Sequence, residues 1–172
     1  MDKEKNFAFI DSQNLNLGVQ SLGWKLDFAK FRRYLKEKYS VTVAYLFIGY
    51  VPQNQNLYSS LQKMGYVLIL KPTIPDGAGK PKGNVDADMV LHTIIEYPKY
   101  DKAIVVSSDG DFYSLVKYLY DNGKLKFVMS PYIKTCSALL KKSAKEKIVF
   151  MNNLKKKLEY HKNKKAPPKD KT

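Results

Sequence analysis

Cysteine and histidine are nearly absent from this 172-residue chain. Cys136 is the single cysteine, so an internal disulfide framework is excluded and a reducing compartment is favoured. His92 and His161 are the two histidines, and neither has a cysteine or histidine at the spacing of a zinc site, so we expect His92 to pack or to lie at the surface.

Long apolar runs are absent too. No run approaches the roughly 20 residues that a membrane-spanning helix needs. The apolar run near the N-terminus is too short for a secretory signal. We therefore expect a cytoplasmic protein with no membrane partner.

Acidic residues are scarce relative to basic ones, with 16 against 30, which gives a formal net charge of +14. The excess is uneven, because residues 141–172 hold 12 lysines and only three acids. A basic surface of this size favours polyanions such as RNA. A solubilising role for the lysines stays open from charge alone.

Strand-like and helix-like patterns alternate along the chain, which predicts a mainly parallel sheet of five or six strands in a three-layer α/β/α fold. We expect a domain over residues 1–151 and a basic helix with a disordered tail over residues 152–172. The segment 73–84 is rich in Gly, Pro and Lys and is expected to be a loop. The predicted strands are 7–11, 41–50, 66–71, 102–108, 124–130 and 148–151, and the predicted helices are 26–40, 54–65, 85–97, 111–123, 137–147 and 152–165.

Carboxylates gather where the predicted elements meet the carboxyl edge of this sheet, where α/β folds bind their ligands. Asp11 ends the first strand. Asp86 and Asp88 open a helix, and Asp109 and Asp111 follow a buried strand. Such acids repel one another unless a cation lies among them, and carboxylate oxygens suit Mg²⁺ or Mn²⁺. The sequence therefore predicts a divalent-metal site.

Helix capping is the alternative function of these acids. Asp109 or Asp111 can cap the helix that follows, and acids at positions 86 and 88 suit the start of a helix. Residues two apart on a helix point to different faces, so we expect only one of Asp86 and Asp88 to face the site. Asp11 ends a strand, and we expect it to have no capping role.

Lysines are the candidate contacts for a nucleic-acid backbone. Lys80 and Lys82 lie in the predicted loop, and Lys155, Lys156 and Lys157 lie in the predicted basic helix. The loop sequence GAGKPKG lacks the GK[ST] ending of a phosphate-binding P-loop.

Three motifs, FIDSQNL (9–15), KGNVDADMVLH (82–92) and VVSSDGDFYSLV (105–116), occur in this order. Together they resemble the NYN domain, in the LabA/DUF88-like branch of the PIN-like nuclease superfamily, over roughly residues 6–130. The resemblance implies a PIN-like fold and a metal-dependent ribonuclease site. The residues that match the family site are Asp11, Asn14, Asp86, Asp109 and Asp111, with Ser107 and Ser108 expected to help bind the nucleic acid by hydrogen bonding.

Two positions depart from the family pattern. Ser108 stands where members usually have glycine, and His92 stands where many carry a further acid, for which Asp88 is a candidate substitute. The leading hypothesis is a Mg²⁺- or Mn²⁺-dependent endoribonuclease acting on single-stranded RNA. A catalytically inactive RNA-binding module is the main alternative, and a small-molecule phosphatase is a third. A homodimer is compatible with the sequence.

Overall fold

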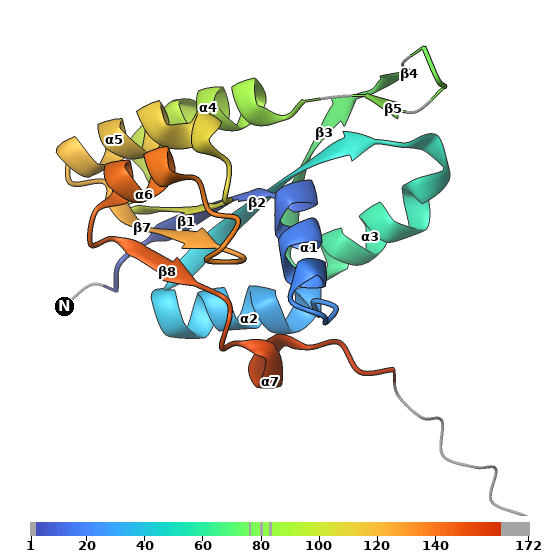
Figure 1. Ribbon diagram of the computed structural model, residues 1–172, viewed down its shortest axis with the longest axis horizontal. Coiled ribbons are helices and arrows are strands. Elements are labelled where there is room, and N and C mark those ends of the chain that lie inside the picture. The colour runs from blue at the N-terminus through green and yellow to red at the C-terminus, as the bar shows by residue number, and fades with distance from the viewer. Residues whose placement is uncertain (1–2, 76, 80, 83, 163–172) are drawn as a thin grey trace, which may run out of the picture.

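A six-stranded parallel sheet forms the centre of the molecule, in the order β3-β2-β1-β6-β7-β8 (Figure 1). The computed structural model describes residues 3–75, 77–79, 81–82 and 84–162. Every neighbouring pair of strands in this sheet is parallel. The strands are β1 (Asn6–Asp11), β2 (Val41–Tyr50), β3 (Tyr66–Pro72), β6 (Ala103–Val106), β7 (Leu125–Ser130) and β8 (Ile148–Phe150).

Helices cover both faces of the sheet (Figure 1). The predicted three-layer α/β/α fold with a mainly parallel sheet of five or six strands is therefore confirmed. One face carries α1 (Ser12–Ser21), α2 (Phe28–Tyr39), α3 (Gln55–Lys63) and α7 (Lys155–Leu158), and the other carries α4 (Asp86–Ile95), α5 (Tyr113–Asp121) and α6 (Ala138–Ala144). Short 3-10 turns lie at Pro52–Asn54, Tyr97–Lys99 and Gly110–Phe112.

The central strand β1 is buried along its whole length because both of its faces are covered. Ala8 and Ile10 point to the core beneath α1 and α2, whereas Phe7 and Phe9 point to the core beneath α4 and α5. This alternation places the last residue of β1 at the carboxyl edge with buried neighbours on either side. A polar group at that point is held rigidly.

The helix α1 was missed by the sequence prediction. Its sequence, SQNLNLGVQS, holds Asn, Ser and Gly residues of weak helix propensity. Leu15 and Val19, four residues apart, are fully buried against the sheet, so tertiary packing stabilises the helix.

Two predictions about the loop and the C-terminus were wrong. The predicted loop 73–84 contains a small antiparallel ribbon, β4 (Ile74–Pro75) with β5 (Pro81–Lys82). Of the predicted basic helix 152–165, the described residues 152–162 contain a single helical turn, α7, after which the chain extends, and residues 163–165 lie outside the described residues. The expected disordered tail lies outside the described residues, and the boundary between residues 151 and 152 stays a prediction.

The segment after α7 is attached to the start of α2. Leu158 is 1% exposed, and Glu159 forms an isolated antiparallel bridge with Leu26. The Tyr160 N–H donates to the Lys25 carbonyl at 2.8 Å, and the Lys30 ammonium donates to the Glu159 carbonyl at 2.8 Å. These contacts make residues 154–160 part of the folded unit.

In the described part of the chain, no helix has both the length and the apolar character needed to cross a membrane.

Candidate metal centre

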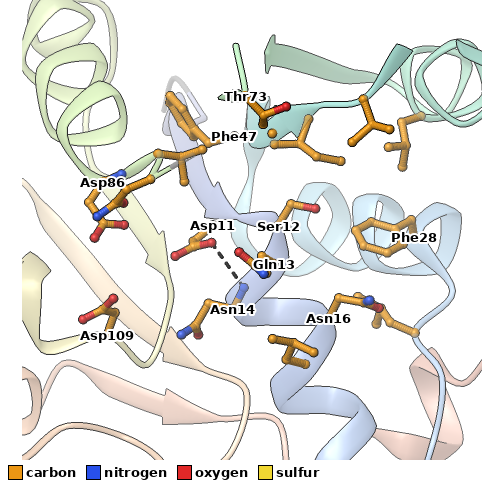
Figure 2. Close-up of a pocket in the computed structure, with 18 of the residues that line it drawn as sticks. Asp11, Ser12, Gln13, Asn14, Asn16, Phe28, Phe47, Thr73, Asp86 and Asp109 are labelled. Atoms are coloured by element: carbon orange, nitrogen blue, oxygen red, sulfur yellow. Dashed lines mark hydrogen bonds between the residues drawn. The ribbon is translucent and has the colours of Figure 1, made fainter. Parts of the chain in front are cut away.

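The carboxyl ends of β1 and β6 bring two of the acidic motifs together. These strands are adjacent and parallel, and Ile10 pairs with Val106, so the residues that follow emerge at the same edge of the sheet. Asp11 ends β1, and Asp109 lies three residues after β6. The start of α4 adds Asp86, and Figure 2 shows these three side chains converging on one space.

Asp86, Asp109 and Asp111 form a compact acidic cluster. One carboxylate oxygen from each lies within 4.8 Å of those from the other two. Opposite ligands of a Mg²⁺ ion are about 4.2 Å apart, because each lies about 2.1 Å from the ion. Neighbouring ligands of such an octahedral ion are about 3.0 Å apart, so the three carboxylates would have to move closer together, by up to roughly 2 Å, to share one small hard cation.

The cluster has no positive partner within the described residues. The ion pairs there join other acids, and none involves Asp11, Asp86, Asp109 or Asp111. Four acids without a compensating base carry an electrostatic cost that a divalent cation removes. Their all-oxygen donor set fits Mg²⁺ or Mn²⁺ and disfavours thiophilic metals.

Asp11 lies beside this cluster and is only 6% exposed. The pKa of its carboxyl is raised from 3.8 to about 6, mainly by burial and also by the neighbouring Asp86 and Asp109 carboxylates, against hydrogen bonds from backbone N–H groups. Asp11 also caps α1, since its Oδ1 accepts the Asn14 N–H at 3.2 Å. The expectation that Asp11 has no capping role was therefore wrong, because a helix follows the strand directly.

Asp86 is half-buried in the first turn of α4. Burial raises the pKa of its carboxyl, and the Asp109 and Asp111 carboxylates add to this, against a hydrogen bond with Asn84. The Asn84 side-chain oxygen also accepts the Asp86 N–H at 2.8 Å, which fixes the start of the helix. Asn84 was missed as a site residue, although Asn two positions before an acid is a typical turn signal.

Hydrogen bonds fix the loop after β6. The Asn14 Oδ1 accepts the Ser108 N–H at 2.8 Å, which ties the first motif to the third. The Ser107 Oγ accepts the Asp109 N–H at 3.1 Å, and the Asp109 Oδ1 accepts the Asp111 N–H at 2.9 Å. Asp109 thus combines a capping role with its place in the cluster.

Ser107 and Ser108 have buried side chains. Ser107 is fully buried and Ser108 is 7% exposed. The Ser108 hydroxyl forms a buried hydrogen bond with the Ser130 hydroxyl on β7, at 2.7 Å. The expectation that they contact nucleic acid was wrong, because both side chains turn into the fold and position the loop.

Gly110 lets this loop pass close to the segment before α6. A Cβ atom at position 110 would collide with the Ser137 hydroxyl. The Ser137 N–H also donates to the Ser108 carbonyl at 3.0 Å. The glycine between Asp109 and Asp111 is therefore required by packing, and Ser137 is a supporting residue that no sequence signal identified.

Asp88 does not join the cluster. Two positions along α4 rotate it by about 200° from Asp86, and its carboxylate pairs with Lys71 at 2.7 Å. The structure therefore does not bring Asp88, predicted as a metal ligand, to the cluster of the other acids. His92 lies one turn further on and packs edge-to-face against Tyr45 and Phe47.

The structure describes the side chains of only some of the lysines that were predicted to contact nucleic acid. Lys155, Lys156 and Lys157 are exposed on α7, and Lys155 faces Glu159 at 3.8 Å. Lys82 lies in β5, and its side chain is outside the described part of the structure. Lys80 is outside the described residues altogether.

A cleft of about 860 Å³ extends from the acids along α1. This volume is in the usual range of ligand sites. Figure 2 shows Asp86 and Asp109 at one end and Phe28 at the other, with Ser12, Gln13 and Asn16 between them. The acids therefore form one end of a larger cleft.

Comparisons with known proteins agree with this architecture. The model of the NYN domain family matches residues 7–152. A solved structure of a protein of unknown function, VPA0982 from Vibrio parahaemolyticus, is 24% identical, with a TM-score of 0.71 over 89% of this chain and 98% of that one. That likeness supports the fold alone. No curated protein matches this chain.

We predict that replacing Asp11 with Asn stabilises the metal-free protein above pH 6. The wild-type carboxyl has a higher pKa when folded, so it lowers the stability as the pH rises from about 4 through 6. Asparagine removes this cost, which amounts to at most roughly 3 kcal/mol, because one pKa unit is about 1.4 kcal/mol. Urea denaturation in chelator at pH 4 and pH 7.5 measures the difference.

Asp88→Asn is the matched control, because Asp88 pairs with Lys71 outside the cluster. Its stability should change by less than about 1 kcal/mol at either pH. An Asp11→Asn protein that is no more stable than wild type at pH 7.5 would contradict the unfavourable burial of this carboxylate.

Proposed function

This chain belongs to the NYN domain family, and we propose that it is a divalent-metal-dependent endoribonuclease acting on single-stranded RNA. The observation that carries the proposal is the cluster of Asp86, Asp109 and Asp111 at the carboxyl edge of the sheet. Family membership supports a nuclease with RNA as its substrate. The net charge of +14 supports a polyanionic substrate independently.

We assign the metal to Asp86, Asp109 and Asp111, with Asp11 beside them as a fourth carboxylate, whose own pKa Asp86 and Asp109 raise. A bound Mg²⁺ or Mn²⁺ supplies an activated water and offsets the charge that builds on the phosphodiester. The protein residues hold the donors in place before substrate arrives. Asn14 positions the loop after β6, since its side-chain oxygen accepts a hydrogen bond from the Ser108 N–H.

Ser108 and His92, the two residues that depart from the family pattern, both make contacts within the fold. Ser108 is bonded to Ser130, and His92 packs on Tyr45 and Phe47, so neither blocks the acids. This favours an active nuclease over an inactive RNA-binding module. The module becomes the conclusion if the protein binds RNA without cleaving it.

The finer assignments follow from the same motifs. We place the chain in the LabA/DUF88-like branch of the PIN-like superfamily. We propose that residues 1–151 are the nuclease domain and that residues 152–172 add basic contacts to RNA. The single cysteine, Cys136, is buried and free, which fits a cytoplasmic location.

Replacing Asp109 with Asn should abolish RNA cleavage. The change keeps the side-chain oxygen that accepts the Asp111 N–H but removes the negative charge that holds the ion. We expect the cleavage rate of a labelled single-stranded RNA in Mn²⁺ to fall at least about a hundredfold, as with loss of other charge-stabilising groups. Asp88→Asn, which changes an acid outside the cluster, should cleave like wild type. Equal cleavage by wild type and Asp109→Asn would overturn the assignment.

The lysines of α7 generate a separate prediction about affinity. Replacing Lys155, Lys156 and Lys157 with alanine should weaken RNA binding and reduce its salt dependence. For a single strand, each lost phosphate contact reduces the magnitude of the negative slope of log K against log salt by about 0.7. Fluorescence anisotropy in chelator over a range of salt concentrations measures both.

The matched control removes Lys3, Lys5 and Lys102, which precede β1 and β6 at the opposite edge of the sheet. Both triple variants lose the same charge. An identical salt slope for the two variants would show that the α7 lysines contribute no more to RNA binding than the control lysines do.

A further inference from the structure

The cleft beside the acidic cluster has an apolar wall that metal chemistry does not require. Leu17 on α1 and Leu57 on α3 both line it, and they are 56% and 45% exposed. Phe28 and Val51 line the same space and are partly exposed. The apolar surface of these two leucines remains in contact with water unless a ligand fills the cleft and covers it.

Amide side chains lie between this wall and the acids. Gln13 and Asn16, both on α1, line the cleft (Figure 2). Within the described residues, neither side chain has a hydrogen-bond partner. An amide offers both a donor and an acceptor, which is the pattern that the edges of nucleobases match. Apolar surface beside free amides is thus suited to a flat heterocycle with polar edges.

Charge inside the cleft argues against a row of phosphates. Among the described residues that line it, Lys25 is the one cation, and the other charged residues are the aspartates of the acidic site. Phosphates that pass through the cleft away from the metal would meet few positive groups. The exposed lysines of α7 lie outside it, in a segment bonded to Lys25 and Leu26. The backbone of a bound strand is better placed along this outer surface.

We propose that the cleft binds an unpaired base of a single-stranded nucleic acid, seated against Leu17 and Leu57 beside the phosphate at the acidic cluster. The proposal rests on the nuclease function above and deepens it by assigning a place in the cleft to one base of the substrate. A duplex keeps its bases stacked and paired inside, so it cannot supply this base without opening. The cleft thereby selects single strands.

Binding of labelled oligomers in chelator tests the proposal. The probes are a single-stranded uridine oligomer, an abasic oligomer with the same backbone length and charge, and a duplex of that length. Wild type should bind the uridine oligomer roughly tenfold more tightly than the abasic one, a difference typical of one seated base. The duplex should bind no better than the abasic oligomer.

Leu17→Ser and Leu57→Ser should reduce this preference to less than about threefold while leaving affinity for the abasic oligomer unchanged. Both side chains are exposed, so the fold tolerates the change. Leu91→Ser is the control, because Leu91 is 60% exposed on α4 and does not line this cleft. It should keep the full preference.

Several outcomes would overturn the inference. Equal affinity for the base-bearing and abasic oligomers, equal affinity for the duplex, no binding of any oligomer, or an unchanged preference in both leucine variants would each do so. Capture of apolar peptides in place of the oligomers would do so too.

The nuclease function fails separately from this inference. A protein that prefers bases in chelator but never cleaves RNA in Mn²⁺ or Mg²⁺ retains the base site and loses the nuclease assignment. A protein that cleaves RNA with no preference for bases retains the nuclease and loses the base site.

Discussion

Repulsion among carboxylates is the constraint on which this site depends. Asp11, Asp86, Asp109 and Asp111 come from three separate segments and meet without a basic partner among the described residues. Burial of Asp11 adds to the cost, as its raised pKa shows. A protein with net charge +14 has many lysines that would relieve this repulsion, yet none of the described lysines forms an ion pair with the cluster. Such an arrangement is strained by repulsion unless a cation lies among the acids, and a divalent cation would relieve that strain.

The rest of the fold holds these acids in register despite that strain. Buried parallel strands fix the positions of Asp11 and the loop after β6. Asn14 and Ser107 then secure the loop with hydrogen bonds to the Ser108 and Asp109 N–H groups. Because these contacts are internal, the site is organised before a ligand arrives. The adjoining cleft continues from the acids along α1.

Most of the architecture could be predicted from the sequence because strand and helix periods are strong there. The strand 41–50 was predicted to the residue, whereas α1 was missed because packing rather than propensity stabilises it. The alternation of strands and helices along the sequence implied a parallel sheet. In such a sheet, Asp86 and Asp109 lie at the same edge. The buried orientation of Ser107 and Ser108, and the turning of Asp88 toward Lys71, depend on three-dimensional packing. No local pattern encodes those.

Crystals soaked with Mn²⁺ provide the most direct measurement of the central claim. An anomalous difference map locates manganese without assumptions about the reaction. The account predicts a peak between the carboxylates of Asp86, Asp109 and Asp111, and its loss in crystals of Asp109→Asn. A map in which manganese binds elsewhere, with the cluster empty at saturating concentration, would contradict it.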